Sequence, residues 1–388
     1  MKSLALLALL TVGVCAGAQS TRDSQAFQYR FGGYYRSLLT SSHSYFTGDV
    51  YGDSLNRLRL SLDAKWNRSL TVHVDYDNDL HFGSLITEPD FDLIRQRQSA
   101  CYLDLLHIWV DEKHAYWDTS LYRGYLTLRH GPAELTAGRQ RIAWGTAHFW
   151  SPADVFNPIS PLQVEEDERE GVDAAQLSIR LPKDLRWSTV YAPQDGIDHS
   201  TEATRIATTV HNFDLAVLGG RFRQDWLAGA DFAGQLRGAG LRGELTYTSR
   251  ASSSQSNALR LTFGSDYAIN NKWYVLAEYF YNQGQPPGYT PGQPFNPSVL
   301  LQYTNEIYTV QRHFVSAGAR YSVTPLLNLQ TYAVVDPVGR GVLFLPEASY
   351  NLTTNTDLSV GGQLFASSST GEFHRVPNLF NLLFTVHF

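Results

Sequence analysis

Charged and hydrogen-bonding side chains occupy every second position in several stretches of this chain. Two such rows are Arg57, Arg59, Ser61, Asp63, Lys65 and Thr71, His73, Asp75, Asp77, each alternating with apolar residues. In a β-strand, side chains two positions apart point to the same face. Each row therefore predicts a strand with one apolar face and one polar face. The polar face carries both charge signs and can contact ions and polar solutes.

The turns between such rows set which polar residues face one another. If residues 67–69 form a three-residue turn, Trp66 lies opposite Leu70 and the polar faces of the two strands coincide. Arg59 then faces Asp77, Ser61 faces Asp75 and Asp63 faces His73. A Gly131-Pro132 turn similarly places Arg129 opposite Glu134. The residues that we expect on this water-facing polar surface of the sheet are Arg57, Arg59, Asp63, His73, Asp75, Asp77, Arg123, Arg129, Glu134, Arg139, Arg141, Arg180, Arg260, Glu278 and Arg320.

Catalytic and metal-binding chemistry has little support in the pattern of residues. The histidines have no spacing that is typical of a catalytic site. His107 and His114 are seven residues apart, which is only weak support for a metal site. His73 is better explained as a residue of the polar wall than as a metal ligand. We therefore expect no enzyme activity, no cofactor and no metal site.

A stretch rich in aromatic residues, proline and acid follows these strands at residues 143–170. It contains Trp144, Trp150, Asp154 and Phe156, and it continues into the acidic run Glu165, Glu166, Asp167, Glu168. Two interpretations remain open. The stretch can fold into a lumen and set acid opposite wall arginines, which creates a transverse field. Alternatively, it forms an extracellular cap with a solvated acidic rim.

Arg139 poses a problem for a regular strand. Continued alternation after the Gly131-Pro132 turn places it on a lipid-facing side, at a cost of roughly 2–4 kcal/mol. A β-bulge at Gly138 would turn Arg139 and Arg141 toward the polar side. We predict that bulge; otherwise the strand leaves the bilayer early.

The segments that must position these residues are long alternating stretches, often of 10–12 residues, joined by alternately short and long connections. This pattern predicts an all-β fold, a transmembrane antiparallel β-barrel. Counting the connections gives about 18 strands, with 16 as the alternative, if residues 85–118 form one long loop; residues 101–111 could instead form a strand. Short turns then face the periplasm and long loops the exterior. Aromatic residues make up 13% of the chain and charged residues only 18%, in keeping with a membrane barrel.

Both ends of the chain carry export and assembly signals. Lys2, the apolar stretch 4–14 and the small residues Ala16 and Ala18 predict a signal peptide over residues 1–18. Residues 19–388 then form a single barrel domain. Apolar residues occupy every second position up to the terminal phenylalanine: Phe380, Leu382, Phe384, Val386 and Phe388. This ending resembles the C-terminal strand by which outer-membrane proteins are recognised by the barrel-assembly machinery.

The stretch Gly138-Arg139-Gln140-Arg141-Ile142-Ala143-Trp144-Gly145, with the aromatic and proline residues up to Pro158, resembles a motif of porin-like outer-membrane proteins of Gram-negative bacteria. The resemblance implies a barrel in the outer membrane, in contact with lipid and lipopolysaccharide. It implies no substrate. It also allows the matching residues Arg139, Gln140, Arg141 and Trp144 to shape the pore mouth.

The function that follows is a channel for passive diffusion of small hydrophilic or anionic solutes. The alternatives are a polysaccharide exporter or another specific exporter, and a structural or adhesive barrel without an open pore. The net charge of −6 gives no reason to expect nucleic-acid binding. Porins often form trimers, so a homo-oligomer is also open.

Overall fold

The computed structural model describes residues 27–95, 101–158, 161, 171–194, 199–252, 256–284 and 306–388. Over these residues the chain is almost entirely β-strand. The expected signal peptide and the acidic residues Glu165, Glu166, Asp167 and Glu168 lie outside the described residues. Within the described part, no helix is long and apolar enough to cross a membrane.

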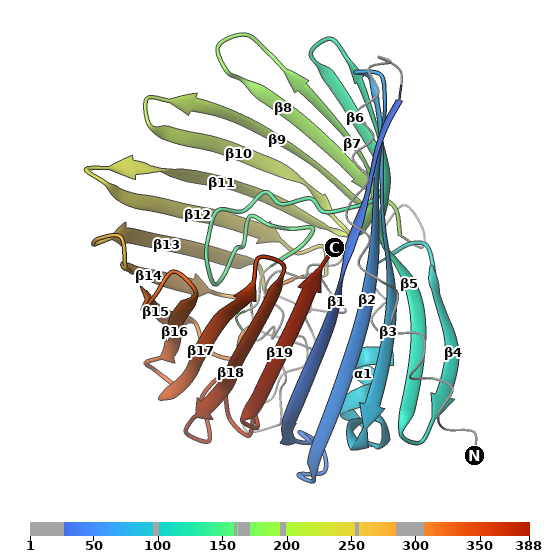
Figure 1. The fold of residues 1–388 in the computed structure, drawn as a ribbon. Helices are drawn as coiled ribbons and strands as arrows, with labels where there is room; N and C mark the ends of the chain where they lie inside the picture. Colours follow the sequence, from blue (N-terminus) through green and yellow to red (C-terminus); the bar gives the residue numbers. More distant parts are fainter. Residues whose placement is uncertain are drawn as a thin grey trace.

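Nineteen strands are present in the described residues, and eighteen of them form one closed wall (Figure 1). Each wall strand pairs antiparallel with the next, and β19 pairs with β1, which closes the barrel. The wall strands are β1 (Phe27–His43), β2 (Val50–Trp66), β3 (Leu70–Gly83), β5 (Ala115–His130), β6 (Ala133–Gln140), β7 (Val172–Arg180), β8 (Arg186–Ala192), β9 (Thr201–Val210), β10 (Phe213–Phe222), β11 (Asp225–Leu236), β12 (Ala239–Ser249), β13 (Ala258–Ala268), β14 (Trp273–Asn282), β15 (His313–Ser322), β16 (Leu327–Asp336), β17 (Gly341–Thr353), β18 (Thr356–Ala366) and β19 (Leu379–His387).

The predicted fold class and the count of 18 strands are therefore confirmed. The prediction of one long loop over residues 85–118 is wrong in part. This region holds a short 3-10 helix (Ser84–Thr87), the helix α1 (Asp90–Arg95) and the extra strand β4 (Leu106–Glu112), and β5 already begins at Ala115. β4 pairs with the outer end of β5, while β3 pairs directly with β5, so β4 adds to the wall without changing its closure.

The predicted registers of the β2–β3 and β5–β6 pairs are confirmed. Trp66 pairs with Leu70, and Arg59, Ser61 and Asp63 face Asp77, Asp75 and His73. Arg129 faces Glu134 across the Gly131-Pro132 turn. Asn67 in the first of these turns has φ 60, and Gly131 in the second has φ 55, backbone conformations that fit tight hairpin connections.

The outer surface of the barrel is apolar. Large apolar side chains remain exposed on the outward positions of many strands, for example Leu126, Leu135, Val217, Phe263 and Val360. Trp66, Trp226 and Trp273 are exposed near strand ends, where aromatic girdles of membrane barrels lie. The terminal-strand residues Phe380, Leu382 and Phe388 also face outward and are exposed. Such an exterior fits a lipid bilayer.

Candidate functional site

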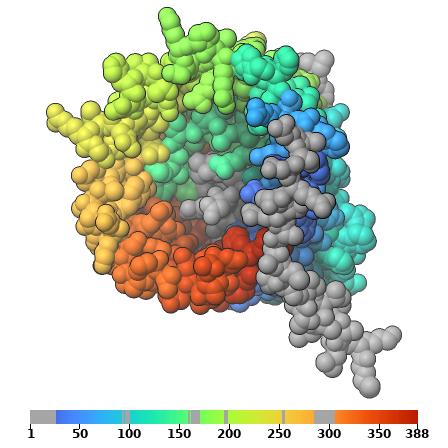
Figure 2. Space-filling model, turned by 45° about the horizontal axis from the view of Figure 1, so that its top comes forward, coloured from blue at the N-terminus to red at the C-terminus, as the bar shows by residue number. Residues whose placement is uncertain are grey.

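The site is the inside of the barrel, and its main feature is a segment that leaves the wall at the end of β6. We call residues 141–158 the lumen loop. Figure 1 shows the chain after β6 running across the interior of the ring, and Figure 2 shows teal-green atoms of this region inside the ring. Of the two interpretations of this stretch, the described part therefore fits the loop that folds into the lumen and not the extracellular cap.

Apolar side chains of the lumen loop pack against inward residues of two groups of strands. Ile142, Trp144 and Phe156 join a buried cluster with inward residues of β7 to β10. Phe149 and Trp150 join a second cluster with inward residues of β14 to β17, and the Trp150 ring stacks on Phe280 at 5.2 Å. Burial of these large side chains supplies much of the energy that holds the loop inside.

Polar wall residues hold the same loop by its backbone. The carboxylate of Glu244 on β12 accepts hydrogen bonds from the N–H groups of Thr146 (2.5 Å), Ala147 (2.7 Å) and Ala153 (2.9 Å), and from the Ser151 hydroxyl. Thr262 on β13 donates to the carbonyl of Trp150 at 2.8 Å. These bonds satisfy backbone groups that the inward course of the chain would otherwise bury without partners.

Glu278 on β14 completes this set of wall anchors. Its carboxylate accepts from the N–H groups of His148 (2.8 Å), Phe149 (3.1 Å) and Trp150 (3.0 Å). Glu278 is therefore inward, as expected, but it is buried under the loop and does not face the open lumen.

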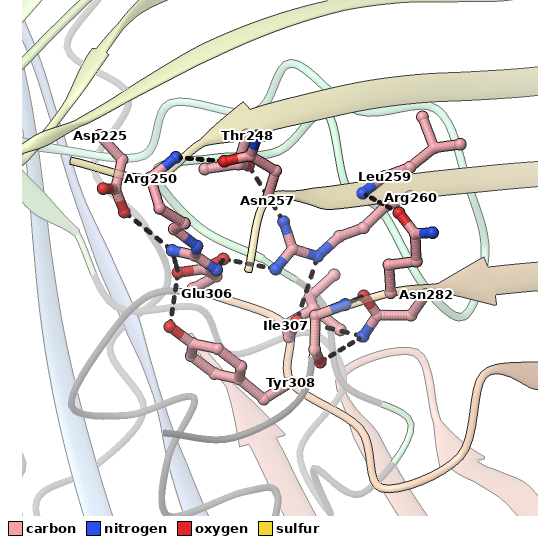
Figure 3. A network of polar contacts seen from close by, with 12 residues as sticks. Asp225, Thr248, Arg250, Asn257, Leu259, Arg260, Asn282, Glu306, Ile307 and Tyr308 are labelled. Carbon is pink, nitrogen blue, oxygen red and sulfur yellow. Dashed lines mark hydrogen bonds and ion pairs between the residues drawn. The ribbon is translucent and has the colours of Figure 1, made fainter. Parts of the chain in front are cut away.

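A second loop, which connects β14 to β15, approaches the lumen loop. Residues 306–312, which we call the returning loop, lead into β15. Arg250 (2.6 Å) and Arg260 form ion pairs with Glu306 (Figure 3). Arg260 also donates a hydrogen bond to the Ile307 carbonyl at 3.2 Å. Asp225 pairs with Arg250 at 2.8 Å on the other side. A small cavity lined by Pro152, Asp154, Arg260 and Glu306, among others, marks where the two loops meet.

This ionic network lowers the pKa of the Glu306 carboxyl to about 2, because the charges of Arg260 and Arg250 outweigh the effect of burial. The candidate Arg260 is thus inward but buried, and its guanidinium is used to hold the returning loop.

Wall arginines on β2 are also paired. Arg57 binds Asp79 through two hydrogen bonds of 2.8 Å, and Arg59 binds Asp77 through two of 2.6 Å. These four side chains are buried. Farther toward the periplasm, His73 lies between Asp63 (2.7 Å) and Asp75 (3.0 Å) and stacks on Tyr125. These candidates form a charge-balanced inner wall.

Four further candidates occupy inward positions closer to the open lumen or its rim. Arg123 lies opposite Asp75, and Arg129 pairs with Glu134 at 2.5 Å near the periplasmic turn. Arg180 lies opposite Arg186 at the exposed end of β7. Arg320 on β15 is exposed, with its guanidinium over the ring of Tyr274.

Arg139 does not line the lumen. It keeps the outward place in regular pairing, opposite Gly124 on β5 and Asp173 on β7, without a register shift at Gly138. The predicted bulge is therefore wrong, and β6 instead leaves the wall one residue after Arg139. Arg141 follows this exit and is exposed at the start of the lumen loop.

The candidates on the lumen loop face the wall and not a pore. Trp144, Trp150 and Phe156 are buried in the clusters described above. Asp154 is buried too, and its Oδ1 accepts from the Asn157 backbone at 3.3 Å. A transverse field from Asp154 is therefore not supported.

An accessible polar row remains on inward positions that the lumen loop leaves uncovered. Inward residues of neighbouring strands pair side by side in a row that climbs from one end of β15 to the opposite end of β1: Arg320, Gln330, Glu347, Gly361, Asn381 and Thr40. Arg320 is exposed, and the others are partly exposed. We call these residues the open row. It offers donors, acceptors and both charge signs to a solute.

Sequence reasoning missed Glu244 and Glu306 as anchors. Glu244 occupies an inward position in an alternating strand, so its facing was predictable. Its partners were not, because they are backbone N–H groups of a loop more than 90 residues away.

The chain matches no protein family model and no curated protein. Solved structures of similar fold exist among Pseudomonas outer-membrane proteins. OccK5 (OpdH) of Pseudomonas aeruginosa is 11% identical, with a TM-score of 0.58 over 93% of this chain and 98% of that one. A BenF-like porin from Pseudomonas fluorescens is 9% identical, with a TM-score of 0.59 over 94% and 99%.

The outer membrane protein OprD from Pseudomonas aeruginosa gives a TM-score of 0.58 at 10% identity and covers 97% of both chains. At such low identity the shared property is the fold. The chain therefore has the architecture of a porin-like outer-membrane β-barrel.

Proposed function

We propose that this protein is a channel of the outer membrane of a Gram-negative bacterium, through which small hydrophilic solutes diffuse passively. The observation that carries the proposal is the lumen loop, which packs against inward residues of β7 to β17 and leaves the open row, from β15 to β1, accessible. A loop held in this way narrows a water-filled barrel without filling it with its own side chains.

The charges favour a pore of weak ion selectivity. Arg57, Arg59, Arg242 and Arg260 each pair with a carboxylate. Among the described candidates Arg129, Arg141, Arg180 and Arg320 are exposed, and of these Arg129 pairs with Glu134 and Arg180 lies at the end of β7. A modest preference for anions would therefore depend first on Arg141 and Arg320, which lie on the lumen loop and in the open row. This distribution gives little support to a polysaccharide exporter, for which a continuous track of unpaired arginines would be expected.

Single-channel recording in a planar bilayer tests the proposal. Purified, folded protein should give stable conductance steps, and a salt gradient should give a small reversal potential. An absence of steps from protein that is demonstrably folded in the membrane would contradict an open channel and favour the structural or adhesive barrel.

We also propose that β19 is the recognition strand for the barrel-assembly machinery. Its apolar residues face outward, and Phe388 exchanges two backbone hydrogen bonds of 3.0 Å with Gly33 on β1, at the seam where the barrel closes. Deletion of Phe388 should lower the amount of folded protein in the outer membrane. Unchanged assembly would contradict this role.

A further inference from the structure

We propose that residues 101–112, which we call the exterior strap, lie at the outer edge of the apolar band of the barrel, and that lipid acyl chains cover their lower part, residues 101–105. This proposal concerns how the barrel sits in the membrane and does not depend on which solute the channel conducts.

The strap covers the place where β6 leaves the wall. The outward side chains of Arg139 and Asp173 form two hydrogen bonds of 2.9 Å there, and both residues are buried. Arg139 also donates to the carbonyl of Leu103 at 2.6 Å, and the N–H of Leu103 donates to Asp173 at 2.8 Å. The strap thus encloses an ion pair that outward-facing positions would otherwise expose to lipid.

Enclosure matters because a hydrocarbon environment offers no hydrogen-bond partners. An ion pair there is tolerated only when its remaining donors and acceptors are satisfied. The third nitrogen of Arg139 donates to the Leu121 carbonyl at 3.0 Å. Leu121 also holds the strap backbone, because its N–H donates a hydrogen bond to the Leu105 carbonyl at 3.2 Å.

The height of the strap agrees with a place in the outer leaflet. A strand tilted by about 40° gains roughly 2.5 Å of height per residue. Leu121, which binds Leu105, is nine residues above His130 at the periplasmic end of β5, or roughly 22 Å. Trp117 then lies roughly 32 Å above that end. The apolar band of such barrels is about 25 Å tall, so the strap spans its outer edge.

The outward surface of the strap is apolar and continues that of the wall. Tyr102 is 51% exposed and Leu103 is 49% exposed. The ring of Trp109 stacks on Trp117 of β5 at 5.6 Å, and its Nε1 donates to Thr119 at 3.0 Å. Paired tryptophans with an apolar face and a satisfied N–H are typical of the membrane interface. The charged residues Asp111 and Lys113 follow at the tip.

Site-directed spin labelling tests this placement. Cys101→Ser removes the only cysteine of the mature chain while it keeps a donor for the Gly171 carbonyl. Single cysteines at Tyr102 and Leu103 are labelled with a nitroxide, and the protein is reconstituted in phosphatidylcholine vesicles. Val217→Cys, on the outward face of β10 and 56% exposed, is the lipid control, and Lys113→Cys is the water control.

The proposal expects the labels at positions 102 and 103 to collide with oxygen more than with a water-soluble nickel chelate, as the label at 217 does. Nickel accessibility like that of position 113 would overturn it, because the strap would then lie in water. Low accessibility to both reagents would also overturn it, since a second protein copy would then cover the strap instead of lipid.

Discussion

Glu278 on β14 accepts a hydrogen bond from the backbone N–H of Trp150, 3.0 Å away, and so ties the lumen loop to the barrel wall at its aromatic tip. His148 and Phe149 donate to the same carboxylate. A single wall residue thereby fixes three consecutive residues of the element that narrows the lumen.

Glu278→Ala should therefore loosen the lumen loop. Each hydrogen bond to a charged group contributes roughly 1.5–3 kcal/mol, and the variant leaves three N–H groups without this acceptor. We expect larger and noisier single-channel conductance from a barrel that still assembles. Glu347→Ala, on the open row beside Gln330, is the matched control and should leave the noise unchanged. Quiet wild-type conductance from Glu278→Ala would show that the apolar clusters alone hold the loop.

Removal of the exposed lumen arginines should shift the ion selectivity toward cations. One charge at about 4 Å changes the energy of a passing ion by roughly 1 kcal/mol in water, so Arg141→Ser and Arg320→Ser should each change the permeability ratio by at most about fivefold. The reversal potential in a salt gradient measures this change. Arg237→Ser, in an exposed turn outside the lumen, is the control. Equal shifts in all three variants would assign the selectivity to the total charge of the protein.

The wall was predictable from the sequence because alternation is local. The register between β2 and β3 follows from one turn and one apolar row, and Arg59 faces Asp77 for that reason. The orientation of Arg139 was predicted wrongly, because the residues that shield its outward side chain from lipid come from another part of the chain. Its cover is Leu103, 36 residues away, which no periodicity within β6 indicates.

The lumen loop illustrates the same limit. Its aromatic and proline content marked it as a folded segment, but burial of Trp150 depends on Phe280 and on the carboxylate of Glu278. These contacts are set by the curvature of the closed barrel, which brings β14 opposite β6. Local sequence patterns carry no information on that distance.

Acid should release the returning loop only at very low pH. The pKa of Glu306 falls from 4.5 in the unfolded chain to about 2 in the fold, so its stabilising effect is present above about pH 4.5 and is lost as the pH falls through about 2. Channel noise should stay constant from pH 7 to pH 4. Glu306→Gln, which cannot carry the charge, should be noisy throughout that range. Noise that rises in the wild type between pH 6 and 4 would contradict control by Glu306.

Glu372 should make the stability of the returning loop fall as the pH rises, which is the opposite of the effect of Glu306. It lies buried in the loop before β19, and its carboxylate accepts from the N–H groups of Val310 and Gln311 at 2.7 and 2.9 Å. Burial raises its pKa to about 8. The stabilising contribution of Glu372 is therefore complete below about pH 4.5 and is lost as the pH rises toward about 8. Hydrogen exchange of residues 306–312 should accelerate between pH 5 and 8 beyond the intrinsic change, and Glu372→Gln should remove that excess.

Gly138→Ala should destabilise the barrel, because the exit of β6 from the wall requires a backbone that an L-residue rarely adopts. Gly138 has φ 123, and a Cβ at this position would lie 2.3 Å from the carbonyl oxygen of Gly124 on β5. Strained φ values cost about 1–3 kcal/mol before any steric overlap is added. Gly131→Ala is the matched control, since Gly131 also has a positive φ of 55 but nothing lies within 4 Å of its added Cβ. Urea unfolding in lipid vesicles should show a larger loss of stability for Gly138→Ala than for Gly131→Ala. Equal losses would mean that β5 and β6 can separate enough to admit the methyl group, and the close approach of these strands would then not be what requires glycine.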